Sequence, residues 1–204
     1  MSGDVHAGFC ERREVRLLPA THLLVMCQTR AEAEAALAAL RLILAELGLE
    51  LKDAKTRIVH LTVGGEGVDF LGFHHRWVRA NRARHVQFLA RWPSRRAMQH
   101  ASDRVREITA RERLLLPVED VVQDLNEYLR GWAGYFRYGN AARHFNLIEH
   151  HAHNRLALFM AKRHQRTRAY GWWLVTYSSP NRLGLVSLAG TVVAPRPHRA
   201  WRGK

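Results

Sequence analysis

Cysteine is scarce in this chain of 204 residues, and long apolar runs are missing from it. Cys10 and Cys27 are too few and too poorly placed to form a disulfide framework or a structural zinc site. No stretch has the length and composition of a membrane span or of a signal peptide. We therefore expect a protein of the reducing cytoplasm that makes no membrane contact.

Motifs for covalent or metal chemistry are missing as well. Neither cysteine has a credible paired base, and no Gly-x-Ser-x-Gly motif occurs. The turn at Gly64–Gly67 lacks the Gly-Lys-Ser/Thr ending of a phosphate loop, and Glu66 and Asp69 are interpreted as solvating that turn. The histidines between His144 and His153 have no carboxylate or thiolate at a recognised metal spacing. We expect no catalytic residue, no metal and no cofactor, and interpret these histidines as phosphate contacts beside arginines.

Positive charge is present in large excess and is concentrated in one half of the chain. The formal net charge is +14 and the isoelectric point is about 11.0. Residues 1–92 carry 13 Lys and Arg against 10 Asp and Glu, whereas residues 93–204 carry 19 against 8. Guanidinium groups bond phosphate in a bidentate manner and stack on bases, so the excess favours a nucleic acid over an anionic membrane surface as partner.

The first half predicts a small layered unit of strands around one helix. Residues 1–22 show no clear period and are interpreted as a disordered or unrelated lead-in. Apolar runs follow, Gly48 ends the expected helix, and a glycine-rich turn stands at 64–67. This order indicates the arrangement β-α-β-turn-β. The expected elements are a strand at 23–27, a helix at 31–47, a strand at 57–62 and a strand at 68–73.

The second half predicts helices. The spacing from Trp77 to Trp92 is irregular, and Pro93-Ser94 is expected to be a domain boundary that ends in a helix N-cap. Three helices are expected, with a break at Leu114–Pro117, because apolar residues recur at three- and four-residue steps. Their apolar stripes are Met98, Ala101, Val105 and Ile108; Val118, Val121, Val122, Leu125, Leu129, Trp132 and Phe136; and Phe145, Ile148, Ala152, Leu156 and Phe159.

The C-terminal stretch predicts a strand hairpin. The runs 172–177 and 183–188 flank a Ser-Ser-Pro-Asn turn, and a basic extended tail follows. The predicted fold class is therefore α+β. Its expected parts are 1–22, a half-sheet layered with one helix at 23–92, a three-helix bundle at 93–168, and a hairpin with its tail at 169–204.

The stretch Arg130–Asn140 interleaves arginines, aromatics and glycines at helical spacing. Trp132 and Phe136 belong to the apolar stripe, whereas Arg130 and Arg137, seven residues apart, lie over each other on a different face. Two arginines on a helix are also typical of an ordinary solvated face. The functional interpretation is that the helix buries its stripe and presents two guanidinium groups, with Tyr135 and Tyr138 nearby, to a partner.

The order of these motifs resembles group II intron-encoded reverse transcriptases. Leu47–Leu61 followed by Val68–His74 resembles the late palm, and Pro93-Ser94, Leu129–Asn140 and Lys162–His164 resemble the maturase-specific region, domain X, which is the helical thumb. The resemblance spans roughly residues 23–202, and Arg130–Asn140 is its most diagnostic part. It implies that Lys55 matches a palm lysine near the nucleotide phosphates and that Phe70, Leu71, Gly72 and Phe73 match the primer-grip hairpin.

The chain departs from that family at the catalytic motif. The family carries Tyr-Ala-Asp-Asp before the strand that corresponds to 23–27, whereas this chain has Pro19-Ala-Thr-His22. Polymerases need carboxylates to hold two magnesium ions, so an intact polymerase would need Mg²⁺ but this chain alone should be inactive. Three interpretations stay open: a shortened RNA-binding maturase module, a decayed fragment, and a part that needs a separate palm polypeptide.

The expected partner is structured RNA of a group II intron, with DNA as a further candidate and the oligomeric state open. The arginines and the lysine are expected on phosphates, and Tyr135 or Tyr138 is expected to stack on an exposed base. The candidate RNA-binding residues are Arg130, Tyr135, Arg137, Tyr138, Asn140, Arg143, Arg155, Lys162, Arg163 and Arg166.

Overall fold

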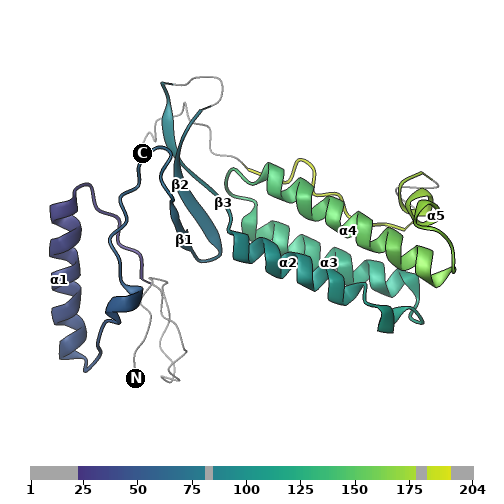
Figure 1. The fold of residues 1–204 in the computed structure, drawn as a ribbon, viewed down its shortest axis with the longest axis horizontal. Coiled ribbons are helices and arrows are strands. Elements are labelled where there is room, and N and C mark those ends of the chain that lie inside the picture. Colours follow the sequence, from purple (N-terminus) through teal and green to yellow (C-terminus); the bar gives the residue numbers. More distant parts are fainter. Residues whose placement is uncertain (1–22, 81–84, 178–182, 194–204) are drawn as a thin grey trace, which may run out of the picture.

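The computed structural model describes residues 23–80, 85–177 and 183–193, without the side chains of Lys55 and Tyr177 (Figure 1). Within these residues the chain forms five α-helices and one three-stranded antiparallel sheet, so the predicted α+β class is confirmed. Figure 1 shows the sheet between helix α1 and a long layer of helices. None of the helices in the described ranges is long and apolar enough to cross a bilayer.

Helix α1 (Arg30–Glu46) begins with strong local signals but buries none of its residues. The Thr29 side chain accepts a hydrogen bond from the Glu32 amide, and the Glu32 side chain accepts one from the Thr29 amide, which is a complete capping box. The expected strands at 23–27 and 57–62 do not form. They are extended coil because no neighbouring strand of the described residues pairs with them, and a strand needs such a partner for its backbone hydrogen bonds.

The sheet is a meander of β1 (Val68–Phe70), β2 (Phe73–Arg79) and β3 (Gln87–Pro93). The run expected as one strand at 68–73 is a tight hairpin, in which Leu71 and Gly72 both take positive φ angles of 46° and 78°. The irregular spacing of 77–92 hid β3, since β2 and β3 are partly exposed on both faces and show no clean alternation.

Three helices follow the sheet: α2 (Arg95–Ile108), α3 (Val118–Phe136) and α4 (Ala142–Arg163). Ser94 caps α2 through its side chain, as the sequence predicts. The predicted stripes form the core of this helical part: nearly all of their residues are buried, and only Met98 and Val118 are partly exposed at its edge. The helices therefore pack on the faces that their spacing predicts.

The predicted C-terminal strand hairpin is wrong. Helix α5 (Arg168–Trp172) begins at the capping residue Thr167 and continues as a π-helix at Trp173–Tyr177. The aromatic and β-branched residues of this run favour a strand, but Val175 is buried against the helices and packing overrides that preference.

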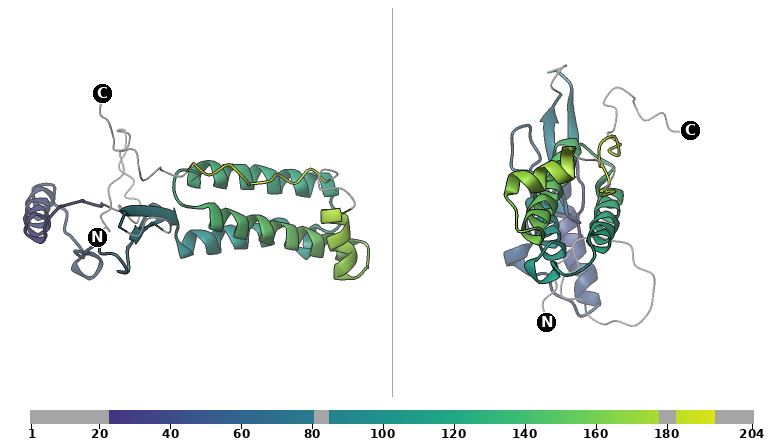
Figure 2. Two further views of the ribbon diagram at one scale, coloured as in Figure 1. Left: turned by 90° about the horizontal axis from the view of Figure 1, so that it is seen from above. Right: turned by 90° about the vertical axis from the view of Figure 1, so that its right-hand side faces the viewer.

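Residues 183–193 also form no strand; they run in extended form along α3 and α4 (Figure 2). The Asn126 side chain donates to the Gly184 carbonyl and accepts from the Val186 amide, both at 2.7 Å. The Glu149 carboxylate accepts from the Ser187 hydroxyl and the Leu188 amide, and Leu188 is buried. This segment therefore closes one side of the helical core.

Candidate nucleic-acid interface

The turn between α3 and α4 is held from two sides. The Asn140 amide donates to the Arg91 carbonyl of β3 at 2.7 Å, and the Val193 amide donates to the Arg137 carbonyl at 2.7 Å. Gly139 fits because a Cβ there would lie 2.5 Å from the Arg91 carbonyl oxygen. The turn therefore fixes the end of β3, the end of α3 and the start of α4 against one another.

Exposed arginines from these three elements are brought to this turn. Arg91 lies on β3, Arg137 follows α3, and Arg143 lies in the first turn of α4. The Arg137 guanidinium lies over the half-exposed ring of Tyr138, 4.9 Å from its centre. We call Arg91, Arg137, Tyr138 and Arg143 the junction surface. Arg130 is exposed seven residues before Arg137, about two helical turns away, on the same side of α3.

These arginines lack acidic neighbours at bonding distance. Within the described ranges, no ion pair joins Arg91, Arg130, Arg137 or Arg143 to a carboxylate. Other surface arginines are paired, for example Arg104 with Glu107 at 2.7 Å. Unpaired guanidinium groups keep their full capacity for bidentate bonds to an anion such as phosphate.

Tyr135 lies on another side of α3 from these arginines. Its hydroxyl donates to the Leu71 carbonyl at 2.8 Å, and its ring packs 5.5 Å from that of Phe73. It therefore holds the β1–β2 turn against α3 while about half of the side chain stays exposed. The structure does not bring Tyr135 together with Tyr138.

Asn140 contributes to the turn through its backbone, and its side-chain Oδ1 is buried without a partner among the described residues. Phe70 to Phe73 form the tight turn between β1 and β2, and their assignment to a primer grip stays a prediction. The fold places Lys55 in a short 3₁₀-helix at Asp53–Lys55.

Arg155 and Arg163 bond inside the fold instead of standing free. Arg155 donates to the Thr109 hydroxyl at 3.0 Å and to the Thr109 carbonyl at 3.1 Å, at the C-terminal end of α2. Arg163 donates to the carbonyls of Leu114 and Leu116 in the next connection. Cations at a helix C-terminus satisfy its unpaired carbonyls and oppose the helix dipole. Both arginines therefore have a structural role, because their guanidinium groups bond to carbonyls of the fold.

Lys162 and Arg166 are exposed at the end of α4 that lies away from the sheet. Neither side chain makes an ion pair within the described residues. They are thus separated from the junction surface by most of the length of α4, and the candidate residues divide between its two ends.

The histidines near the junction surface are less cationic than the sequence suggested. Burial, and secondly the charge of Arg143, lower the pKa of His144, whose ring stacks on Trp92. Burial also lowers the pKa of His151, in spite of its bond to the Ser102 carbonyl. Both shifts disfavour the charged form, so they do not support the interpretation of these two histidines as cationic phosphate contacts.

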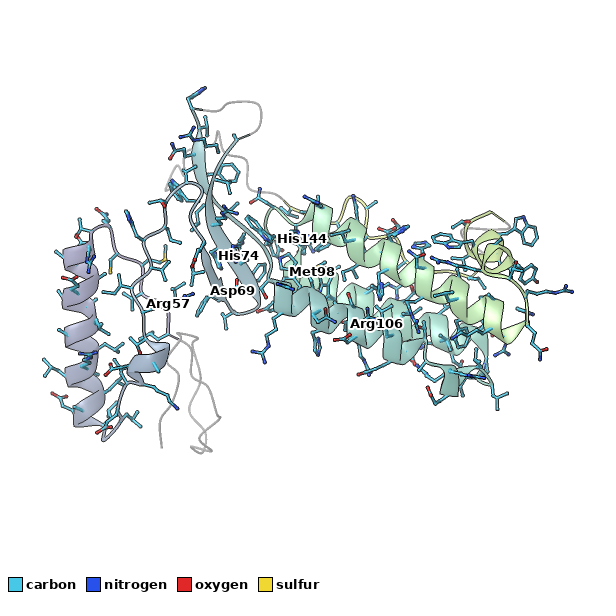
Figure 3. The ribbon with its side chains drawn as sticks, viewed as in Figure 1. Arg57, Asp69, His74, Met98, Arg106 and His144 are labelled. Atoms are coloured by element: carbon cyan, nitrogen blue, oxygen red, sulfur yellow. The ribbon has the colours of Figure 1, made fainter. Side chains whose placement is uncertain are left out.

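The structure shows one carboxylate–histidine pair in the sheet, where Asp69 and His74 lie close together (Figure 3). The two side chains are 2.6 Å apart, so Asp69 does more than solvate a turn. No group of three metal-ligating side chains occurs among the described residues.

Sequence reasoning missed Arg91, because it lies in the stretch whose spacing predicted no element. The one local sign of its exposure is the change from the small apolar Ala90, which is buried, to Arg91, which is exposed.

Fold and surface together define an α+β protein with a helical domain that exposes unpaired arginines at one end. Residues 98–178 match the model of the family described as "Group II intron, maturase-specific domain". The match runs from within α2 to the end of the π-helix and contains the whole Arg130–Asn140 stretch. A maturase-type C-terminal portion is therefore present, as the resemblance implies. A search of curated proteins gave no match to the chain.

Proposed function

We propose that the helical domain binds folded RNA of a group II intron and assists its folding and splicing. The observation that carries this proposal is the junction surface, where arginines from three elements lie without acidic partners among the described residues. Arg137 and Arg143 fall within the maturase-specific match at 98–178, and Arg91 lies just before it. The excess of positive charge in residues 93–204 supports the same partner. The intron RNA performs the splicing chemistry, and the protein contributes binding.

In this proposal Arg91, Arg130, Arg137 and Arg143 contact phosphates, and Tyr138 offers its exposed face to an unpaired base. Phosphate contacts supply affinity, whereas selectivity comes from RNA shape and from unpaired bases. Lys162 and Arg166 extend the contacts to the other end of α4. Arg155 and Arg163 are left out, because their guanidinium groups bond to backbone carbonyls.

The test measures binding of a group II intron RNA as a function of salt concentration. The double variant Arg130→Ala/Arg137→Ala should weaken binding and reduce the slope of log affinity against log salt by about 0.7 to 0.9 for each lost phosphate contact. Arg104→Ala is the matched control, since it removes an exposed helical arginine that is already paired with Glu107. A flat salt response of the unaltered protein, or equal slopes for both variants, contradicts the proposal.

A second candidate function follows from the exposed apolar side chains of the N-terminal part. Val25, Met26, Leu42, Ile43 and Leu47 are all more than half exposed. Such a surface favours the interpretation that a separate polypeptide completes a reverse transcriptase palm here. Primer extension with Mg²⁺ that requires both polypeptides would support this function, and RNA binding without any such requirement favours the first candidate.

A further inference from the structure

Figure 1 shows α5 at the end of α4 that lies away from the sheet, and three aromatic rings cluster on the residues in and beside α5. The Tyr170 and Trp173 rings are nearly parallel, with centres 6.2 Å apart and planes inclined by 29°. The His164 ring meets Tyr170 edge-on at 5.8 Å. Trp173 is 52% exposed although it is among the largest apolar side chains. We call His164, Tyr170 and Trp173 the distal cluster.

The backbone that carries the distal cluster is fixed. Gly171 lies so close to α4 that an added Cβ would come within 2.0 Å of the Ala157 carbonyl oxygen. Thr167 caps α5, and Arg168 donates to the Asn154 side chain at 3.1 Å. Rings held in place before binding lose little conformational freedom when a flat ligand stacks on them.

The stretch of sequence that carries the cluster has charge of one sign. Glu149 is the last acidic residue of the chain, so every charged side chain from residue 150 onward is basic. Arg166 and Arg168 are exposed on either side of Thr167, next to His164 in sequence. An aromatic face beside unpaired cations fits a ligand that is flat, apolar on its faces and attached to an anion.

We infer that the distal cluster is a stacking site for an unpaired RNA base, with Arg166 close to the adjoining phosphate. The inference rests on the proposed function, because it supplies that RNA-binding domain with a second contact, remote from the junction surface. The junction surface binds phosphates of folded RNA, whereas the distal cluster distinguishes an unpaired loop or bulge from a closed duplex. An anionic membrane is the less suitable partner, since the cluster contains rings with polar edges and no aliphatic side chain.

The test compares two RNA probes, a short hairpin with an unpaired loop and a blunt duplex with the same number of phosphates. Wild-type protein should bind the looped probe more tightly. Trp173→Ala should weaken binding of the looped probe about tenfold, because stacking of one base on an aromatic side chain is lost. It should leave the duplex affinity and the salt slope unchanged, because it removes no charge. Trp173→Phe should retain most of the preference.

Leu147→Ala is the matched control, because Leu147 is an apolar side chain of α4 that is 53% exposed and lies outside the cluster. A 2-aminopurine base in the loop provides a second readout: its fluorescence should be quenched by the wild-type protein and not by Trp173→Ala. Unchanged fluorescence with wild type, or an equal loss of both probes in Trp173→Ala, overturns the inference. If Trp173→Ala loses binding to anionic vesicles but binds both RNA probes as the wild type does, the inference is overturned in favour of a membrane site.

Failure of the inference and failure of the proposed function give different results. If the wild-type protein binds both probes with a steep salt dependence but without preference for the loop, only the distal site is wrong. If neither probe is bound in a salt-dependent manner, the proposed function fails and the distal site fails with it.

Discussion

Helices α1 and α3 show how differently two helices of one chain can be stabilised. α1 has a complete capping box but no buried residue. α3 begins after Pro117 without any side-chain cap and buries eight residues. Caps specify where a helix starts, whereas burial of an apolar face supplies most of its stability in a folded protein. The helical part therefore holds its shape by packing, whereas α1 depends on its cap and on exposed ion pairs such as Arg41–Asp53.

Shortening one apolar side chain in each helix tests this difference most directly. Leu129 of α3 is fully buried, and Leu42 of α1 is 69% exposed. Leu129→Ala should lower the free energy of unfolding by about 3 kcal/mol through lost burial and a cavity. Leu42→Ala should change it by less than about 0.5 kcal/mol. Urea denaturation followed by circular dichroism measures both, and similar losses would show that α1 is packed after all.

Arginines provide the next contrast. Arg155→Ala should destabilise the helical part by about 1 to 2 kcal/mol, because the buried Thr109 loses two hydrogen bonds at the end of α2. Arg30→Ala removes an exposed ion pair with Glu34 and should leave the denaturation midpoint unchanged. The same denaturation measurement tests both variants. An Arg155→Ala midpoint equal to that of Arg30→Ala would mean that these bonds add nothing.

The smallest effect concerns pH. The pKa values of His144 and His151 are lowered in the folded protein, chiefly by burial, so the unfolded chain binds protons more readily than the folded one. Stability is therefore full above the ordinary histidine pKa of 6.5 and falls as the pH decreases below it. Melting temperatures at successive pH values should show this fall, and His144→Gln should make it shallower. A fall of equal steepness in the variant would exclude His144 as a cause.

The helices of the domain could be predicted from the sequence because each has an apolar stripe of helical period that the fold buries. Val105, Leu125 and Ile148 illustrate this, since all three were assigned to the core and are buried. The strand at 23–27 was predicted from its apolar composition. A strand also needs a neighbouring strand to pair with, and the composition of the run does not show whether one is present.

The candidate site was predictable in part. Arg130 and Arg137 lie on one exposed side of α3, as their spacing predicts, whereas Tyr135 turns toward Leu71. Spacing gives the direction of a side chain on its own helix, but it does not show which carbonyls lie opposite. That is why Arg155 could not be distinguished from a free cation until its neighbour Thr109 was placed.

Residues 183–193, which run along α3 and α4, affect the order in which the chain acquires its structure. Asn126 and its partner Gly184 are 58 residues apart, so at ~5–20 residues per second the ribosome releases Asn126 on the order of several seconds before that partner. During that interval the core that Leu188 later fills stays open on one side. The helical domain can thus be completed only after residues 184–188 have been synthesised, and this closing step joins segments that are far apart in the sequence.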